Sequence, residues 1–430
     1  MRTISSIEAL ESRIAPAGVF VDATTLSTSL IGGVLKVGPK LANTAVEISV
    51  EQLSNGDFLI TDLAGDNDLE VTADFTGTVA SISITTGTGD DTIHVVLGGD
   101  TALRGGVTIA TGTGDDIVGF NGGTLRGALS VTAKGPAEIT VDSSVEATSI
   151  KGAVKIAQVG GSFVLGTGSE AGSVTAAGAR DFEFHGSTRG PVTLSNALAA
   201  ASYAVSGGAT VGGNLTIAGG IGGDLVDIAD SFVRGFLAVN LGAGNNVLTV
   251  GAGASVHGIA KISALAGDDT VTIGSAAGSG PVFASNVSVS LGEAIAGNAF
   301  SALSGIYSAG LSYKGGSGVD TVNIGATPVI WGALKITGGN GANNVTVGGF
   351  GQLVSFSYAG GTGVDTVTLT GAGSGFLTGA ATLGAGADSL TILGTSPDFF
   401  LAFTVDGGLD ADVVAVDPAL TSAGLKLVNI

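Results

Sequence analysis

Cysteine is absent from this chain, and its absence excludes both disulfide bridges and thiolate metal sites. Basic residues are scarce: 16 Lys and Arg stand against 36 Asp and Glu, giving a formal charge of −20. Such a chain lacks the basic patches that nucleic-acid phosphates and anionic membranes require, so we exclude nucleic acid as a partner. No run of 18 apolar residues occurs, which predicts no transmembrane segment. A cysteine-free chain also fits a location outside the cytoplasm.

Aromatic residues (5%) and helical periodicity are rare, whereas glycine (75 of 430 residues) and alternating Val, Ile, Leu and Thr are abundant. The segment Thr86-Gly-Thr-Gly-Asp-Asp-Thr-Ile-His-Val95 shows the pattern. Its glycines permit tight-turn conformations, Asp91 can bond its own turn, and Ile93 and Val95 point to one side of a strand. The segment therefore predicts a turn followed by a β-strand.

Copies of this turn and strand recur along the chain. Aligned by the apolar residues two and four positions after Asp91, they place one residue of each copy in register with Asp91, at a mean spacing of 23 residues. We call the residues in this register the column. They are Asn67, Asp91, Asp116, Ala137, Gly161, Arg180, Ala201, Asp224, Asn246, Asp269, Asn298, Asp320, Asn343, Asp365, Asp388 and Asp412.

A second marker recurs half a unit away, a glycine followed by an alternating apolar pair, as in Arg104-Gly-Gly-Val-Thr-Ile109. It carries the period through residues 120–220, where the column loses its acids. A unit of this size is too short for a propeller blade and lacks the helix of leucine-rich or ankyrin repeats. We therefore predict an all-β fold: a single elongated right-handed parallel β-helix (β-solenoid) of about 16 coils of about 23 residues, roughly 75 Å long.

In such a stack the strands should bury an aliphatic core. The residues predicted to form one inward row are Ile93, Val118, Val226, Leu248, Val271, Val322, Val345, Val367, Leu390 and Val414.

The chain divides into three predicted parts. Residues 1–20 carry neither marker and are predicted as an N-terminal sorting or disordered segment. Residues 21–62 are predicted as N-terminal cap strands, because Asn55-Gly56 between alternating runs is a strong hairpin signal. Residues 63–430 are predicted as the solenoid, and its irregular coils at about 120–220 mark a bend, an interaction face or drifted repeats.

The turns resemble the calcium-binding nonapeptide of RTX proteins, most closely at Gly315-Gly-Ser-Gly-Val-Asp-Thr-Val322. RTX repeats are tandem, however, whereas one copy per 23 residues lacks the second turn that completes a calcium shell. The column also alternates Asp and Asn from 224 to 365, which separates carboxylates and lets Asn amides donate to neighbours. We predict a structural ladder without a cofactor, with calcium as the alternative. The candidate calcium ligands are Asp90, Asp91, Asp115, Asp116, Asp268, Asp269, Asp320, Asp365, Asp388 and Asp412.

A polysaccharide-active β-helix enzyme is a further alternative, because such enzymes cluster acids and a basic residue on one outer face. Asp91 and Asp116 would be neighbours, but Arg104 and Arg126 belong to the second marker, elsewhere on the coil. Periodicity accounts for all four residues. We therefore expect no enzyme and no catalytic residues.

The other chemically versatile side chains are isolated in the sequence. None of the three histidines (His94, His185 and His257) has a Ser or Cys partner at a recognisable spacing, so we expect neither a triad nor a zinc site. The aromatic candidates for a glycan-binding face are Trp331, Tyr313 and Tyr358. The alternative for these rings is an incidental surface or cap position.

The segment Ala9-Leu-Glu-Ser-Arg-Ile-Ala-Pro-Ala17 resembles the LEPR-type sorting segment of large surface proteins from planctomycete-like and verrucomicrobial bacteria. Ser12 replaces the usual Pro, and Ile14-Ala-Pro16 replaces the Leu-rich tail. Residues 60–420 resemble bacterial surface-exposed β-strand-repeat proteins. The resemblance implies a non-enzymatic extracellular rod or scaffold of the bacterial envelope, whose partners would be cell-surface proteins or glycans. We also expect Leu425-Lys-Leu-Val-Asn-Ile430 to be a strand suited to end-to-end self-association.

Overall fold

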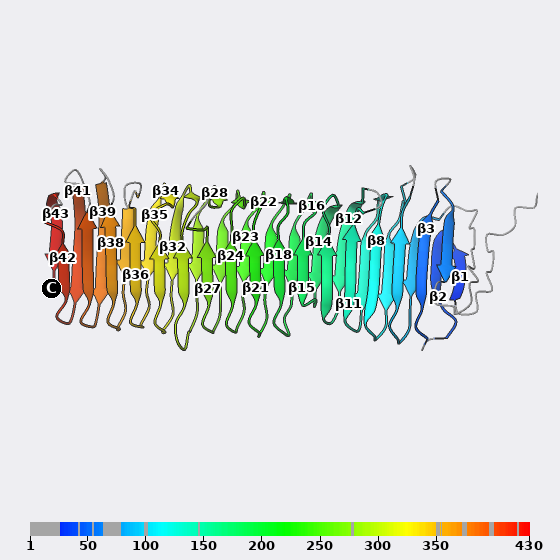
Figure 1. The fold of residues 1–430 in the computed structure, drawn as a ribbon, viewed down its shortest axis with the longest axis horizontal. Helices are drawn as coiled ribbons and strands as arrows, with labels where there is room; N and C mark the ends of the chain where they lie inside the picture. Colours follow the sequence, from blue (N-terminus) through cyan, green and yellow to red (C-terminus); the bar gives the residue numbers. More distant parts are fainter. Residues whose placement is uncertain are drawn as a thin grey trace, which may run out of the picture.

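The computed structural model describes residues 26–41, 44–53, 56–62, 79–98, 102–144, 147–276, 279–349, 353, 355–371, 376–394, 400–418 and 421–430. These residues contain no helix, and their strands form a parallel β-solenoid of about 14 turns with a spacing of about 23 residues. Figure 1 shows the coils stacked along one axis from the N-terminal to the C-terminal end. The predicted β-solenoid and its spacing are confirmed, with about 14 turns in the described residues where the sequence predicted about 16 coils. The sorting segment 1–20 and Asn67 lie outside the described residues.

The strands form two sheets: a coil places one strand in one sheet and, in many coils, a short and a long strand in the other. Sheet I is the 26-stranded sheet, and sheet II contains the strands that begin at or just after a column residue, together with β4. The strands of sheet II are β3 (Glu47–Gln52), β4 (Phe58–Asp62), β6 (Thr92–Val96), β8 (Asp116–Asn121), β11 (Ala137–Asp142), β13 (Gly161–Leu165), β15 (Asp181–Phe184), β18 (Ser202–Val205), β21 (Leu225–Ile228), β24 (Val247–Val250), β27 (Thr270–Ile273), β30 (Ala299–Ala302), β33 (Thr321–Ile324), β36 (Asn344–Gly348), β38 (Thr366–Gly371), β40 (Ser389–Gly394) and β42 (Val413–Val416).

Sheet I contains long and short strands. The long ones are β1 (Leu26–Ile31), β2 (Val34–Pro39), β5 (Ser81–Thr85), β7 (Val107–Thr111), β10 (Leu129–Ala133), β12 (Ser149–Ala157), β14 (Glu170–Ala177), β17 (Val192–Ser195), β20 (Leu215–Ala218), β23 (Leu237–Asn240), β26 (Ala260–Ser263), β29 (Val287–Ser290), β32 (Gly310–Lys314), β35 (Ala333–Thr337), β37 (Ser355–Ala359), β39 (Phe376–Gly384), β41 (Phe400–Gly408) and β43 (Thr421–Val428). The short ones are β9 (Thr124–Leu125), β16 (Ser187–Thr188), β19 (Ala209–Val211), β22 (Ser231–Val233), β25 (Ser255–Val256), β28 (Val282–Phe283), β31 (Ile306–Tyr307) and β34 (Val329–Ile330).

The N-terminal end of the stack differs from the rest because it contains the antiparallel pairs. β1 pairs antiparallel with β2, and β4 pairs antiparallel with β3, as the predicted hairpin requires. β2 and β3 then continue into parallel pairing with β5 and β6. In this register Val46 precedes Asp91 in the column, the place predicted for Asn67, because the chain reverses in β4 before it rejoins the stack at β5.

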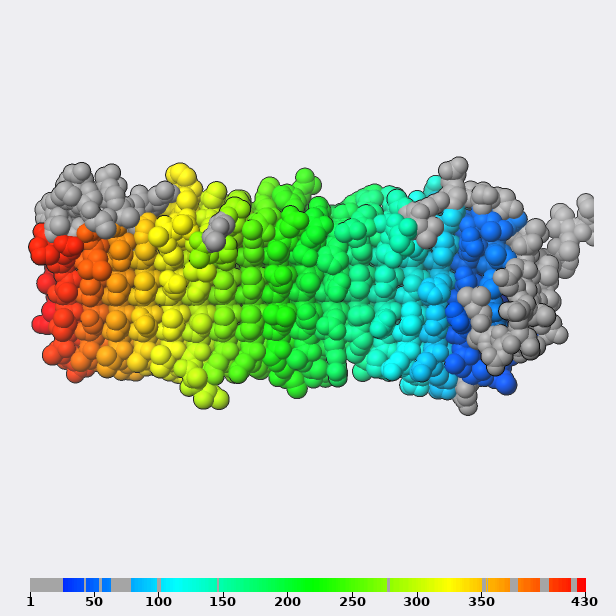
Figure 2. Space-filling view, in the orientation of Figure 1, coloured from blue at the N-terminus to red at the C-terminus, as the bar shows by residue number. Residues whose placement is uncertain are grey.

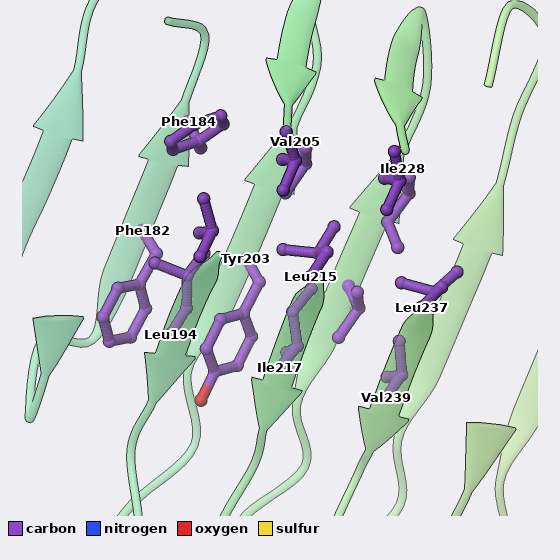
Figure 3. Close-up of a cluster of buried hydrophobic side chains, with 14 of the residues drawn as sticks. Phe182, Phe184, Leu194, Tyr203, Val205, Leu215, Ile217, Ile228, Leu237 and Val239 are labelled. Carbon is purple, nitrogen blue, oxygen red and sulfur yellow. The ribbon is translucent and has the colours of Figure 1, made fainter. Parts of the chain in front are cut away.

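The core lies between the two sheets and is built from alternate residues of every strand. The predicted inward row is confirmed: its members are buried, and Val414 near the C-terminal end packs partly buried against them. Each such side chain contributes about 1.5–3 kcal/mol by leaving water. Figure 3 shows aromatic residues of sheet II, including Phe182 and Tyr203, facing aliphatic residues of sheet I such as Leu194 and Ile217.

The coils between residues 120 and 220 keep the register of the rest. Ala137 pairs with Gly161, and the pairing of β13, β15 and β18 continues the column through Arg180 to Ala201. The core here is aromatic, with the rings of Phe182 and Tyr203 stacked 4.8 Å apart. These coils therefore continue the stack, and they differ from the others in their turns and in the size of their core side chains.

Two aromatic candidates for a glycan-binding face are buried, so this part of the prediction is wrong. Tyr313 and Tyr358 occupy inward positions of β32 and β37, and Tyr313 stacks on Phe300 at 5.2 Å. Their rings fill the core at places where neighbouring coils carry Val289, Ile336 and Ala381. Each ring lies two residues after another inward residue, so strand alternation places it on the same inward face. Trp331 is exposed.

Candidate functional site

The column lies along one edge of the rod, where turns lead from sheet I to sheet II. We call this the turn edge; it is the lower edge in Figure 1. The glycines of the turn bring the backbone against the column side chain. At Gly315 a Cβ atom would lie 1.6 Å from Asp320 Oδ2, so only glycine fits there. The turn folds over the column acids and buries them, apart from the half-buried Asp412.

Column side chains are joined by hydrogen bonds that all run in one direction along the rod. Where the column residue of the next coil is Asp or Asn, the backbone N–H of a column residue donates to its Oδ1. Asp91 N donates to Asp116 Oδ1 at 3.1 Å, and Asp224 N donates to Asn246 Oδ1 at 2.8 Å. The bonds continue unbroken from Ala201 N to Asp412 Oδ1. The column is therefore a side-chain ladder parallel to the backbone ladders of the sheets.

The alternation of Asp and Asn adds a second hydrogen bond at every Asn. Asn246 Nδ2 donates to Asp269 Oδ1 at 2.7 Å, and Asn343 Nδ2 donates to Asp365 Oδ1 at 2.9 Å. Asn298 makes the same bond to Asp320 at 3.0 Å. The predicted donation from Asn amides to neighbouring carboxylates is thus present, and it places a neutral donor between charges that would otherwise stack at about 4.8 Å.

Burial perturbs the acids of the column. Desolvation raises the pKa of six carboxyls above the ordinary aspartate value, because it disfavours the charged form more than the ladder bonds favour it. These six are Asp91, Asp224, Asp269, Asp320, Asp365 and Asp388. The second oxygen is satisfied at some positions: Asp365 Oδ2 accepts from the Tyr358 hydroxyl at 2.7 Å. At others it is buried without a partner, namely at Asp91, Asp116, Asp269, Asp388 and Asp412.

The acids that precede the column lie at the surface of the turn edge and bond the backbone of other turns. Asp90 Oδ1 accepts from Asp115 N at 2.9 Å. Asp268 Oδ1 accepts from the backbone N–H groups of Ile295, Ala296 and Gly297 at 2.9, 2.8 and 3.1 Å, and these bonds lower the pKa of Asp268. Asp90 and Asp268 therefore also serve as internal acceptors.

Calcium requires six to eight oxygen ligands around one point. The structure distributes the candidate ligands along the rod, one or two to a coil, and the described residues contain no group of three or more His, Asp or Glu side chains arranged around a common metal position. The described residues likewise contain no helix able to cross a membrane.

The chain matches no family model, no curated protein and no solved structure. The chemistry of the rod therefore has to be judged from its own geometry.

Catalytic chemistry would require groups that converge. Asp91 and Asp116 are neighbours in the column, as predicted. Arg104 lies just before β7, and Arg126 lies between β9 and β10. The acids and the arginines thus lie at different positions on the coil.

The structure also brings together a cluster that spacing did not indicate. His185 Nε2 lies 3.4 Å from Glu183 Oε2, and His185 Nδ1 lies 3.3 Å from both the hydroxyl and the carbonyl oxygen of Ser206. An activated serine needs a base at about 2.6–3.2 Å that is available to its hydroxyl. Here Nδ1 is shared with a backbone carbonyl and Glu183 is solvent-exposed, so the cluster has the properties of a surface hydrogen-bond network. Its only sequence signal was the one-coil separation of His185 and Ser206.

Proposed function

We propose that the chain is a non-enzymatic structural or adhesive scaffold that presents a rigid β-solenoid rod on the outside of a bacterial cell. The main support is the column ladder, which engages side chains of successive coils from Ala201 to Asp412 in one continuous series of bonds. Such a ladder resists sliding and bending of one coil against the next. The resemblance of the repeats to surface β-strand-repeat proteins supplies the surface assignment.

Surface exposure can be tested in the native bacterium with an epitope tag at the C-terminal end of the chain. We expect antibody or external protease to reach the tag on intact cells. Removal of residues 1–20 should retain the protein inside the cell if this segment directs sorting. A full-length chain that becomes accessible only after lysis would refute the surface role.

A calcium-dependent surface module is the second candidate. It is favoured by the buried carboxylate oxygens without a partner, for example Asp388 Oδ2 and Asp412 Oδ2, which a bound cation would satisfy. In this case a chelator should lower the melting temperature by several degrees and added calcium should restore it. A melting temperature that is indifferent to both reagents would favour the scaffold without calcium.

A further inference from the structure

Turn length is constant along most of the turn edge and departs from this constancy at three places. In the regular coils the second inward residue of a sheet I strand lies seven positions before the column residue, as from Ile109 to Asp116. In three successive coils the separation falls to six, five and four: Val131 to Ala137, Ile156 to Gly161, and Ala176 to Arg180. It rises to nine in two coils, from Val37 to Val46 at the N-terminal end and from Val289 to Asn298.

The three short turns leave a groove of about 640 Å³ in the turn edge. Its lining is mainly apolar and includes Ala157, Val159, Ala177 and Leu198. Arg180 also lines the groove, in a column position that regular coils give to Asp or Asn. Its side chain is exposed, and no acid of the described residues forms an ion pair with it. The groove therefore combines apolar walls with one available positive charge.

The long turn from Val289 to Asn298 forms a projection on the same edge, seen in yellow-green at the lower side of Figure 2. Ile295 at its tip is 96% exposed, the highest value among the large apolar residues described as exposed. Glu293 is exposed beside it and accepts a hydrogen bond from the Ser317 hydroxyl. The three backbone bonds from this turn to Asp268 hold the tip in one conformation. The projection thus presents an apolar tip and a negative charge on a fixed backbone.

Exposed aliphatic residues occupy the turn edge between the groove and the projection. Leu198 (77% exposed) lies in the coil after that of Arg180, and Leu265 (65%) lies in the coil before that of Ile295. Ile221, in one of the two central coils, is also exposed. Arg180 lies five coil steps of about 4.8 Å, or roughly 24 Å, from the projection. The midpoint of this span is also the midpoint between Leu198 and Leu265.

We propose that the turn edge is a self-association surface, on which a second copy of the chain binds antiparallel about a two-fold axis at this midpoint. Ile295 of each copy then enters the groove of the other, and Glu293 meets Arg180. Leu198 of one copy packs on Leu265 of the other. A two-fold axis makes every contact twice, as an isologous interface requires.

Charge complementarity and the regular coil spacing identify the partner as a second copy of the chain. The groove offers a cation and the projection offers an anion, on opposite sides of one midpoint. A partner that contacts the edge over several coils must also carry its contacts at intervals of about 4.8 Å along a straight line, which a second copy of this edge does. Complementary charges across an interface fix its register and suppress other pairings.

The decisive experiment uses the full chain and sedimentation equilibrium. We expect the unmodified chain to dimerise, and R180E and E293R each to weaken the dimer about tenfold or more, because each places like charges at both symmetric contacts. An equimolar mixture of the two variants should dimerise again, since both charged contacts of the mixed dimer then join one acidic and one basic side chain. L409D is the matched control, because Leu409 is 87% exposed on the same edge but lies outside the span between the groove and the projection; it should leave the dimer unchanged.

Restored dimerisation in the mixture would support the proposal, because a folding defect in either variant would not be repaired by the other. The proposal is overturned if the unmodified chain stays monomeric at about 100 μM, or if R180E and E293R dimerise as well as L409D. A second measurement exploits the absence of cysteine. A chain carrying both L198C and L265C should form a disulfide-linked dimer on mild oxidation, whereas L198C combined with L409C should not; equal crosslinking of both would contradict the stated register.

Discussion

Replacement of Asn343 by Asp tests whether the alternation in the column stabilises the rod. Asn343 is buried between Asp320 and Asp365. Its Oδ1 accepts from Asp320 N at 3.2 Å, and its Nδ2 donates to Asp365 Oδ1 at 2.9 Å and to Gly341 O at 2.8 Å. The variant keeps the acceptor, removes both donors and joins Asp320 to Asp365, Asp388 and Asp412 in a run of five carboxyl groups in consecutive coils.

The size of the effect is limited by protonation. Two unit charges at about 4.8 Å repel by roughly 3.5 kcal/mol at an effective dielectric constant near 20. The new carboxyl can take up a proton instead, which costs about 1.4 kcal/mol for each pH unit above its ordinary pKa of about 3.9, or roughly 4 kcal/mol at pH 7. We therefore expect a loss of about 2–4 kcal/mol at pH 7. A protonated carboxyl donates again, so most of the loss should disappear by about pH 4.5.

Urea unfolding of the full chain at both pH values measures this difference. N340D is the control, because Asn340 belongs to the same turn but is exposed, and the same chemical change there should cost below about 0.5 kcal/mol. The argument is refuted if N343D costs no more than N340D, or if its cost is the same at pH 7 and at pH 4.5.

Three further predictions concern the same edge. Burial raises the pKa of six column acids, so the folded chain binds protons more tightly than the unfolded chain. The free energy of unfolding should therefore increase as the pH falls from neutral. Calorimetry should show a higher melting temperature near pH 5 than at pH 7. A steady fall in melting temperature over that range would contradict it. G315A should destabilise the chain by about 1–3 kcal/mol or more, because the new Cβ collides with Asp320. G251A is the control: its new Cβ would lie 3.2 Å from the Ala229 Cβ, and it should cost below about 1 kcal/mol in the same unfolding assay. Y358F removes the donor to buried Asp365 Oδ2 and should destabilise the chain by about 1–3 kcal/mol. Y307F should cost less, because the Tyr307 hydroxyl lies 3.5 Å from its acceptor. Equal costs would show that the Tyr358 hydrogen bond does not stabilise the fold.

The period, the column register and the inward row could be predicted from the sequence because stacking in a solenoid repeats the same environment every coil. Asp320 and Asn343 were placed in adjacent coils by counting alone, and their bond follows from the register. The sequence could not predict structural features that do not follow from the register of the coils. It could not show that the turn folds over Asp320 and buries it, because the direction of a side chain in a glycine-rich turn depends on backbone angles that glycine leaves open.

The candidate surface on the turn edge was harder to foresee. The loss of acids at Ala137, Gly161 and Arg180 was visible in the sequence, but its consequence, a groove, arises from turns shortened by one to three residues across neighbouring coils. The projection at Ile295 corresponds to the longest interval between column residues, from 269 to 298. That the two lie on one edge became evident only once the turns were aligned in space. Tyr313 and Tyr358 were predicted at the surface from their residue type, although their two-residue spacing from Leu311 and Phe356 indicates the inward face.

The direction of the column ladder has a consequence for synthesis. The oxygen that satisfies the backbone N–H of Asp320 belongs to Asn343, so it is translated 23 residues later. At about 5–20 residues per second, a column residue waits roughly 1–5 s for its acceptor. The newest coil of a growing chain therefore lacks its ladder acceptor until the next coil has been translated. Completion of the ladder lags chain elongation by one coil.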